Sequence, residues 1–411
     1  MTDVFFPRQQ DVIRALKRGE LQRLNIFEGS VRSGKTHISL ILWGLWVATM
    51  PAEHDYLMTG RTVTTLKRNC LEPMIILFGE RNFKYSTAAK EGRLFGRRVY
   101  LEGAHDARSE GKIRGMTLAG AYCDELTLFP EDFFRMLISR LSVPGAKLIA
   151  TTNPDNPGHW LKTQFLDREA ELGLRRFVFR LEDNTFLPSE YVEELKKEYS
   201  GTVYYDRFIL GKWVAAEGAI YRVFADRPEP FFGKPDDGEI RMVWIGIDFG
   251  GNGSAHAACV VGTDARLSKL WVLDEYYRKE VISPTQLERD LVGFVQSVKD
   301  RWRIVGIYAD SAEQVLIRGL NAAFAAARLP EVGNSRKKPI NDRIRFTTRM
   351  MGAGRFTVNP NCRHTIEALR TARWDPRHPT EDKRLDDGTV NVDSLDAMEY
   401  AFERQMGDFI R

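Results

Sequence analysis

Residues 29–36 read GSVRSGKT, which matches the pattern G-x-x-x-x-G-K-[ST] in full. The apolar run Leu24–Phe27 precedes this stretch, and a helical pattern from Lys35 to Thr49 follows it. In such a strand–turn–helix context, glycines let backbone N–H groups approach phosphate oxygens, and the helix N-terminus adds a favourable dipole. The stretch therefore predicts a nucleotide-binding α/β domain. Its predicted ATP contacts are Gly29, Ser30, Arg32, Ser33, Gly34, Lys35 and Thr36, with Lys35 on the β- and γ-phosphates and Thr36 on Mg²⁺.

Two polar groups follow later apolar runs and complete this predicted site. Asp124 and Glu125 end the run LAGAYC, where an Asp can hold Mg²⁺ and an adjacent Glu can activate the attacking water. Thr151, Thr152 and Asn153 end the run KLIAT and are candidates for sensing the γ-phosphate. Ordinary turn chemistry at Asn-Pro is the alternative for this second group.

Three further side chains are candidates with equally good plain explanations. Gln9, upstream of the loop, has an amide that can read an adenine edge, although a surface or capping glutamine is an equal alternative. Arg32 and Arg114 are candidates for stabilising transition-state charge, and Arg114 could act on a neighbouring subunit's ATP in a ring. A solvated or DNA-facing arginine is the alternative for both.

The order of apolar runs predicts two α/β domains. Strands at 24–27, 55–59, 94–101, 118–123 and 147–151 alternate with helical patterns at 8–18, 35–49 and 64–78, which favours a parallel sheet. A stretch rich in Pro, Gly and Asp follows a charged helix near 189–197. We therefore predict an ATPase domain over residues 1–214, a linker over 215–240 and a second domain over 241–411.

The second domain has carboxylates at the ends of its predicted strands. Asp248 ends VWIGID, Asp310 ends IVGIYAD, and Asp393 and Asp396 lie near the start of an apolar helix. Carboxylates that converge in this way bind Mg²⁺ or Mn²⁺ through hard oxygen ligands, and two such ions can activate water against a phosphodiester. Helix capping explains Asp393 fully, and an exposed strand end explains Glu275, a further candidate ligand, equally well.

Residues 334–350, NSRKKPINDRIRFTTRM, concentrate basic side chains. Such a stretch can follow a DNA phosphate backbone without reading sequence, although it is more often a solvated loop. The predicted DNA contacts are Arg336, Lys337, Lys338 and Arg343.

Composition sets broad limits on the class of protein. The 411 residues are 43% hydrophobic and 28% charged with a net charge of +4, which is ordinary for a globular chain and permits an anionic partner. The four cysteines form no C-x-x-C pair, which argues against a zinc site or a disulfide framework. The most apolar stretch, 38–48, is too short to span a bilayer, so no membrane partner is expected.

From near residue 5 to its C-terminus, the chain resembles the large terminase subunits of tailed phages. The resemblance is carried by FPRQQ, FEGSVRSGKT, AYCDE, TTNPDNPGHW, YDRFILGKWVAAEGAIY, IGIDFG, IYADSAE and DSLDAMEYA. It implies a P-loop ATPase domain of the ASCE/RecA-like class with a lid, followed by an RNase H-like nuclease domain. It places Thr151–Asn153 in a motif that couples hydrolysis to DNA movement, and Asp248, Asp310 and Asp396 among the nuclease metal ligands. Relatives often carry His at the position of Asp393, so this chain departs from the family there.

The resemblance also implies a function and partners. ATP hydrolysis with Mg²⁺ would drive double-stranded viral DNA through a portal into the procapsid, and a two-metal endonuclease would cut the concatemer at the start and end of packaging. The implied partners are DNA, the portal protein, a small terminase subunit and about four further copies of the chain. The implied location is the host cytoplasm and, transiently, the portal vertex of the procapsid, but not the mature virion.

Three rival functions remain open at this stage. A repair helicase-nuclease would need further helicase motifs and a second RecA-like domain, and neither is visible in the sequence. An ATP-gated DNA-binding module would have inert carboxylates. A cellular transposition ATPase is disfavoured by the fused acidic cluster.

Overall fold

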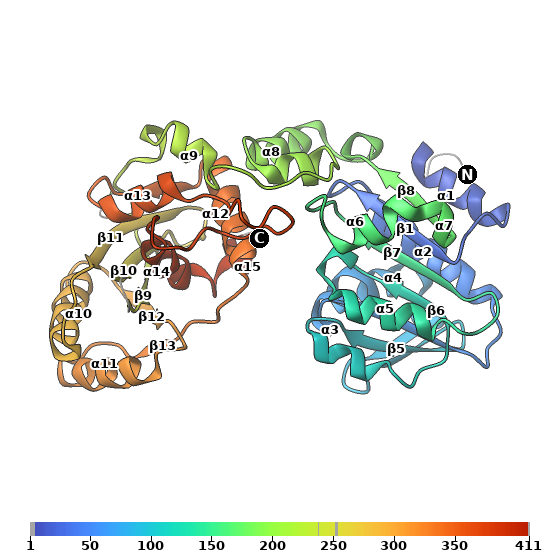
Figure 1. The fold of residues 1–411 in the computed structure, drawn as a ribbon, viewed down its shortest axis with the longest axis horizontal. Helices are drawn as coiled ribbons and strands as arrows, with labels where there is room; N and C mark the ends of the chain where they lie inside the picture. Colours follow the sequence, from blue (N-terminus) through green and yellow to red (C-terminus); the bar gives the residue numbers. More distant parts are fainter. Residues whose placement is uncertain (1–4, 237, 251–253, 410–411) are drawn as a thin grey trace. The chain divides into compact units, whose positions relative to one another are not determined.

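The computed structural model describes residues 5–236, 238–250 and 254–409, which divide into two compact units (Figure 1). Unit 1 comprises residues 1–188 and 203–215, and unit 2 comprises residues 189–202 and 216–411. No helix among the described residues is long and apolar enough to cross a membrane.

Unit 1 is built on an eight-stranded sheet in the order β3-β4-β5-β2-β6-β7-β1-β8. The six strands β5, β2, β6, β7, β1 and β8 run parallel to one another. The hairpin β3–β4 pairs antiparallel with β5 and extends the sheet at that edge. The strand bounds are β1 (Leu24–Gly29), β2 (Asp55–Gly60), β3 (Phe83–Ser86), β4 (Glu91–Leu94), β5 (Arg97–Gly103), β6 (Leu118–Cys123), β7 (Lys147–Thr152) and β8 (Leu174–Phe179). The predicted parallel α/β pattern is therefore confirmed.

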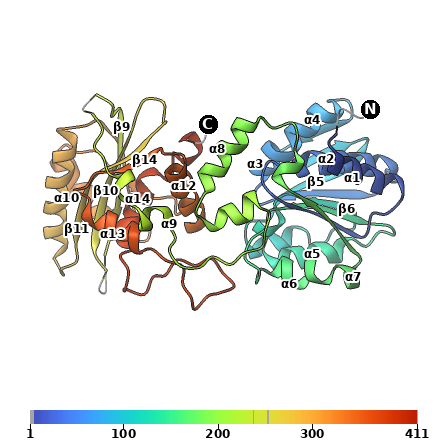
Figure 2. The same cartoon turned by 90° about the horizontal axis from the view of Figure 1, so that it is seen from above.

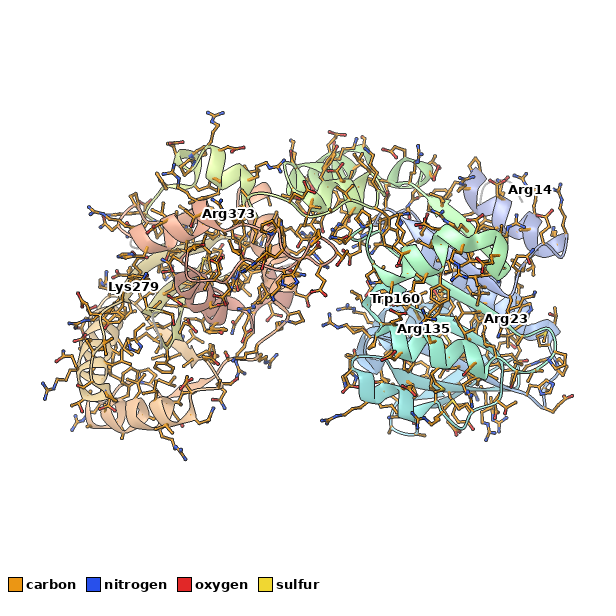
Figure 3. The ribbon with its side chains drawn as sticks, viewed as in Figure 1. Arg14, Arg23, Arg135, Trp160, Lys279 and Arg373 are labelled. Carbon is orange, nitrogen blue, oxygen red and sulfur yellow. The ribbon has the colours of Figure 1, made fainter. Side chains whose placement is uncertain are left out.

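Helices cover both faces of this sheet, because its central strands are apolar on both sides. Figure 2 shows α1, α2 and α4 on one face and α5 and α6 on the other. On the second face the rings of Phe134 and Trp160 lie 5.3 Å apart, and Trp160 is labelled in Figure 3. The helix bounds are α1 (Pro7–Lys17), α2 (Lys35–Thr49), α3 (Val63–Leu66), α4 (Glu72–Phe78), α5 (Glu131–Arg140), α6 (Trp160–Gln164) and α7 (Glu169–Leu172).

The helix predicted over 64–78 is interrupted. A π-helical segment, Lys67–Leu71, separates α3 from α4. Such one-turn insertions are frequent at functional sites, and this one carries a residue of the nucleotide pocket described below.

Unit 2 is built on a six-stranded sheet in the order β13-β12-β9-β10-β11-β14. Strands β9, β10 and β11 form an antiparallel meander, and β12 pairs parallel with β9. Helices α10 and α11 pack on one face, and α14 lies against β9 on the other; Figure 2 shows α10 and α14 on opposite sides of the strands. The strand bounds are β9 (Met242–Asp248), β10 (His256–Thr263), β11 (Leu270–Arg278), β12 (Ile304–Ala309), β13 (Val332–Asn334) and β14 (Phe356–Val358). The helix bounds are α8 (Ser189–Tyr199), α9 (Arg222–Asp226), α10 (Pro284–Lys299), α11 (Gln314–Ala326), α12 (Ile340–Gly352), α13 (Arg363–Thr371), α14 (Asp393–Phe402) and α15 (Met406–Phe409).

The structure corrects the linker predicted over 215–240. This segment contains α9, which packs on α13, and Phe232 bridges to Val358 of β14. Residues 189–202, placed with the ATPase domain from the sequence, also belong to unit 2, where Glu198 forms an ion pair with Arg349 of α12 (2.6 Å). Aromatic side chains such as Phe224, which is fully buried, pack this segment into unit 2.

Gly246 allows α14 to lie directly on β9. A Cβ atom added at Gly246 would lie 1.9 Å from the carbonyl oxygen of Ala397 and 2.6 Å from the backbone nitrogen of Ala401. We expect Gly246→Ala to destabilise unit 2 by about 3 kcal/mol, because backbone atoms must move to relieve the clash. Scanning calorimetry measures the effect. The matched control is Gly293→Ala within α10, where an added Cβ meets nothing within 4 Å and is expected to stabilise the helix. Equal melting of Gly246→Ala and the wild type would contradict this packing.

Candidate active sites

The predicted phosphate loop connects β1 to α2 and needs its glycines. A Cβ at Gly29 would lie 1.7 Å from the carbonyl oxygen of Phe179, and Gly34 has a left-handed backbone with φ 76°. Arg32 also has a positive φ of 56°. The loop is thus held in a conformation that most sequences would resist.

Lys35 is buried at the start of α2 and directed at the end of β7. Its Nζ donates to the carbonyl oxygen of Ser30 (2.9 Å) and to Oδ1 of Asn153 (2.6 Å). Burial lowers the pKa of Lys35 to about 8, although the nearby Glu125 and Asp124 oppose the shift. The structure therefore brings the loop lysine together with Asn153 of the predicted coupling motif.

Asp124 is held by two donors at the end of β6. Its Oδ1 accepts from Oγ1 of Thr151 (3.0 Å), and its Oδ2 accepts from Nδ2 of Asn69 (3.0 Å). Burial raises the pKa of Asp124, and these two hydrogen bonds oppose the shift. The next residue, Glu125, has a left-handed backbone with φ 56°, and its N–H donates to Oγ1 of Thr151 (3.2 Å). A non-glycine residue in this region marks a constrained position of the kind found at active sites.

These side chains line one pocket of about 240 Å³. The lining residues are Lys35, Thr36, Asn69, Asp124, Glu125, Thr151, Thr152 and Asn153. Seven of the eight were predicted from the sequence. Asn69 was missed, because its place depends on the π-helical segment, which leaves no periodic signal in the sequence.

Thr152 joins the pocket to the segment that follows Glu125. The hydroxyls of Thr152 and Thr127 lie 3.0 Å apart, and the Thr127 N–H donates to Oγ1 of Thr152 (3.2 Å). The end of β7 is therefore hydrogen-bonded to the short helix Leu126–Leu128 that follows Glu125.

Three other predicted ATP-site residues, Gln9, Arg32 and Arg114, do not line this pocket. Gln9 is buried, and its Nε2 donates to the carbonyl oxygen of Gly34 (3.2 Å). Arg32 is exposed, and its carbonyl accepts from Nδ2 of Asn184 (2.7 Å). Arg114 does not line the pocket: its exposed guanidinium pairs with Glu110 at 2.7 Å.

The segment 205–221, YDRFILGKWVAAEGAIY, gave no chemistry from its sequence, but its first part braces the phosphate loop. The Val31 N–H donates to the carbonyl oxygen of Phe208 (2.8 Å), and Oγ of Ser30 donates to that of Ile209 (2.7 Å). Arg207 is buried and pairs with Asp155 at 2.6 Å. The carbonyl groups of Phe208 and Ile209 thus hold the phosphate loop at Ser30 and Val31.

Unit 2 brings the predicted carboxylates together. Asp248 ends β9, and Asp310 follows the parallel neighbour β12, with its N–H donating to the carbonyl oxygen of Ile247 (3.1 Å). Helix α14 adds Asp393 and Asp396. Burial raises the pKa of Asp248 to about 9, and Asp396, Asp393 and Asp310 reinforce the shift. The four carboxylates thus share one electrostatic environment.

Asp396 is held by two buried arginines. Its Oδ1 accepts from Arg343 (3.1 Å) and its Oδ2 from Arg384 (2.7 Å). Glu399, fully buried one turn later, accepts from the same guanidinium groups at 2.7 and 3.4 Å. Burial raises the pKa of Glu399 to about 7, and the two arginines oppose the shift. Arg384 and Glu399 could not be predicted from the sequence, because their pairing depends on how the segment between α13 and α14 packs against α14.

The structure decides the open alternatives for Asp393 and Glu275. Oδ2 of Asp393 accepts from the backbone N–H of Ala255 (2.8 Å), and its side chain does not cap α14. Glu275 accepts from the backbone N–H groups of His364 and Thr365, each at 2.8 Å, and so caps α13. Both carboxylate oxygens of Glu275 are thus engaged at the start of α13.

We call the cluster of Asp248, Asp310, Asp393, Asp396 and Glu399 the acidic centre. Its chemistry suits a divalent cation. Its oxygens are the hard ligands that Mg²⁺ and Mn²⁺ prefer, and a cation would relieve the repulsion around Asp248. As the side chains stand, no group of three or more Asp, Glu, His or Cys within the described residues is arranged to hold a metal ion. The reason is that Asp396 faces the two arginines, while Asp310 pairs with Lys337 at 2.5 Å.

Of the predicted DNA contacts at 336–343, Arg336 and Lys337 have exposed side chains, Lys338 is half-buried and Arg343 is buried. The backbone N–H groups of Arg336, Lys337 and Lys338 all donate to the buried Glu403. Arg343 is buried and paired with Asp396 and Glu399, so its assignment as a DNA contact is wrong.

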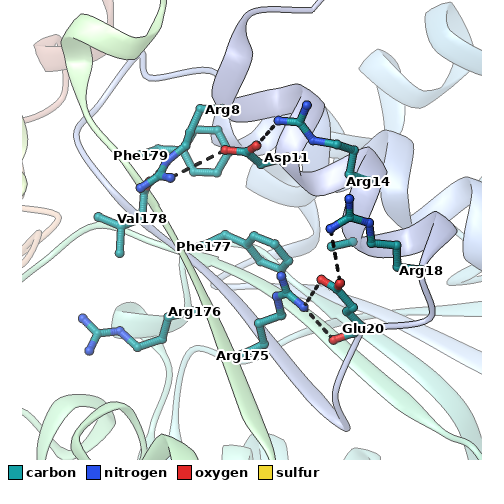
Figure 4. Close-up of a pocket in the computed structure, with 11 residues that line it drawn as sticks. Arg8, Asp11, Arg14, Arg18, Glu20, Arg175, Arg176, Phe177, Val178 and Phe179 are labelled. Atoms are coloured by element: carbon teal, nitrogen blue, oxygen red, sulfur yellow. Dashed lines mark hydrogen bonds and ion pairs between the residues drawn. The ribbon is translucent and has the colours of Figure 1, made fainter.

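A different basic feature lies on unit 1, between α1 and the edge strand β8 (Figure 4). Its walls carry five arginines but only two carboxylates, Asp11 and Glu20. The arginines are Arg8, Arg14, Arg18, Arg175 and Arg176. Both walls also touch the phosphate loop, through Gln9 on Gly34 and through the Phe179 carbonyl on the Ser30 N–H (3.0 Å). We call this feature the arginine groove.

Comparison with known proteins finds similar phage proteins. A family model described as terminase large subunit, T4likevirus-type, N-terminal, matches residues 26–225. The large terminase of a thermophilic bacteriophage superposes with a TM-score of 0.83 at 26% identity, covering 97% of this chain and 98% of that one. The same phage protein in complex with ATP-γ-S gives a TM-score of 0.80 at 26% identity, covering 96% and 98%. No curated protein matches the chain. The family model thus matches most of unit 1, and the fold is shared over almost the whole length, so the chain is similar to bacteriophage large terminases.

Proposed function

We propose that the chain is a packaging motor with a nuclease attached. Unit 1 hydrolyses ATP to move double-stranded viral DNA through the portal into the procapsid, and unit 2 cuts the DNA concatemer when packaging starts and ends. The observation that carries the proposal is the single pocket shared by Lys35, Thr36, Asp124 and Glu125. The ATP-γ-S complex of the thermophilic phage relative supports nucleotide binding at this site.

The pocket assigns a task to each side chain in hydrolysis. Lys35 would neutralise charge that develops on the β- and γ-phosphates, and its burial strengthens this effect. Thr36 and Asp124 would hold the Mg²⁺ that accompanies ATP. Glu125, fixed by its constrained backbone, would orient and deprotonate the attacking water. Asn153, bonded to Lys35, would register the loss of the γ-phosphate and pass the change along β7.

The acidic centre supports the second proposed reaction, the cleavage of DNA. Asp248, Asp310 and Asp393 would hold divalent metal, with Mg²⁺ or Mn²⁺ as the candidates and two ions as the number predicted from the sequence. Bound metal would supply charge stabilisation and an activated water for phosphodiester hydrolysis. Asp396, fixed by Arg343 and Arg384, would set the field around this site.

The remaining partners follow from the proposed function. They are a portal protein, a small terminase subunit and further copies of the chain in a ring of about five, in which the exposed Arg114 could reach a neighbouring ATP site. The chain would act in the host cytoplasm and at the procapsid vertex.

The test of the proposed function is a paired assay on the full chain. ATP hydrolysis and plasmid cleavage with Mg²⁺ or Mn²⁺ are measured on one preparation, with Asp310→Ala as the control for a contaminating nuclease. Hydrolysis together with cleavage that the variant lacks is expected. Strand displacement would instead indicate a helicase-nuclease, and ATP binding without cleavage by either metal would indicate a DNA-binding module with inert carboxylates.

We expect the arginine groove to contact the DNA backbone, because its lining carries five arginines against two carboxylates and Arg8, Arg14 and Arg18 are exposed, although each arginine also pairs with a carboxylate. The side chains of Arg14 and Arg18 are 55% and 69% exposed. Arg14→Glu with Arg18→Glu should weaken DNA binding and lower the slope of log affinity against log salt by about two, since each lost phosphate contact removes about 0.9. Filter binding across salt concentrations measures the slope. An unchanged slope, equal to that of the exposed control Arg81→Glu, would exclude the groove.

A further inference from the structure

The loop that carries Lys337 is built around one buried carboxylate. Glu403, at the end of α14, accepts from three successive backbone N–H groups, those of Arg336, Lys337 and Lys338. Lys337 has a left-handed backbone with φ 46°, which is uncommon for a residue with a side chain. Three donors on a fully buried acceptor compensate for this conformation, so the position of Lys337 is specified by the fold and not left to a solvated loop.

This loop aims Lys337 at the acidic centre. Its Nζ lies 2.5 Å from Oδ1 of Asp310, the residue that follows β12. The lysine side chain is 44% exposed, whereas the side chains of Arg343 and Arg384 are only 5% and 3% exposed. The arginines are therefore fixed counter-ions, while Lys337 can leave Asp310 without exposing a buried charge.

The charges of the centre leave room for one divalent ion. Its five carboxylates are Asp248, Asp310, Asp393, Asp396 and Glu399, and the three basic side chains that pair with them are Lys337, Arg343 and Arg384. Once a cation has displaced the proton that the raised pKa keeps on Asp248, and with Glu399 ionised beside its arginines, the difference is two negative charges, which one Mg²⁺ or Mn²⁺ balances. Two ions would bring two positive charges too many unless a basic group left or a DNA phosphate entered.

We propose that Lys337 stands in for the second metal ion at Asp310, so that the centre without DNA binds a single divalent cation. The inference rests on the proposed nuclease function and specifies how its centre is charged. The resident ion binds Asp248 and Asp393, and Lys337 keeps Asp310 occupied. When a DNA phosphate arrives, Lys337 is free to turn to it and leaves Asp310 for a second ion.

The experiment is a Mn²⁺ titration of the full chain without nucleotide or DNA. Electron paramagnetic resonance measures the free Mn²⁺ at each step. Bound Mn²⁺ is assigned to the acidic centre when the Asp248→Asn variant no longer binds it. We expect one Mn²⁺ per chain at the centre of the wild type and two in Lys337→Met. Lys337→Arg, which keeps the charge, should bind one. The neighbour Lys338→Met should also bind one, because Lys338 acts in this loop through its backbone, whose N–H donates to Glu403 and whose carbonyl accepts from Arg343.

The outcomes separate the inference from the proposed function. Two ions in the wild type, or one in both the wild type and Lys337→Met, would overturn the role of Lys337 and leave the nuclease intact. No Mn²⁺ sensitive to Asp248→Asn would overturn the metal-dependent nuclease itself. Melting curves check that each variant is folded, and an exposed lysine is a mild place for substitution.

Discussion

Replacing Lys35 with alanine is expected to lower ATP hydrolysis about 100- to 1000-fold, the usual cost of removing one group that stabilises transition-state charge. The lysine is buried in the pocket with Asp124 and Glu125, and no other lysine or arginine lines that pocket among the described residues. Phosphate release measured on the full chain gives the rate.

Two controls define this result. Lys84→Ala removes an exposed lysine of β3 and should leave hydrolysis unchanged. Metal-dependent cleavage should survive in Lys35→Ala, because the acidic centre belongs to the other unit. A folded Lys35→Ala variant that still hydrolyses ATP within threefold of the wild-type rate would refute the assigned role. Loss of both activities would refute the separation of the two sites.

Replacing Asp248 with asparagine is expected to lower plasmid cleavage by at least about 1000-fold, because the centre loses the carboxylate around which the others are gathered. ATP hydrolysis should be spared. Cleavage is followed on supercoiled plasmid with Mg²⁺ or Mn²⁺, and Asp300→Asn at the exposed end of α10 is the matched control.

The same variant has a defined effect on stability. Because burial and three neighbouring carboxylates raise the pKa of Asp248 to about 9, ionising this group in the folded state costs free energy. The penalty appears as pH rises above the unfolded value near 3.8 and is complete above about 9. Asparagine is neutral throughout, so the metal-free variant should melt no lower than the wild type at pH 7. A lower melting temperature together with lost cleavage would show that Asp248 holds the fold together and would leave its catalytic role undecided.

Much of the nucleotide site could be predicted from the sequence because its residues are tied to local structure. A glycine-rich turn between strand and helix places Lys35 and Thr36 by backbone geometry alone, and parallel strands bring Asp124 and Thr151 to one sheet edge. Asn69 could not be predicted in this way, because a π-helical segment sets its direction. The same holds for the brace from Phe208 and Ile209, which contacts the loop across almost 180 residues.

The acidic centre shows most clearly which features can be predicted from the sequence and which depend on the tertiary structure. By itself the sequence determined that Asp248 and Asp310 end two strands and that a later helix carries further carboxylates. Only the tertiary structure decided that Arg343 is a buried counter-ion, that Glu275 caps a helix and that Lys337 faces Asp310. The physical reason is that strand ends and helix starts follow from local patterns, whereas the partner of a charge depends on which distant side chains are buried beside it, and burial is a property of the whole packed unit.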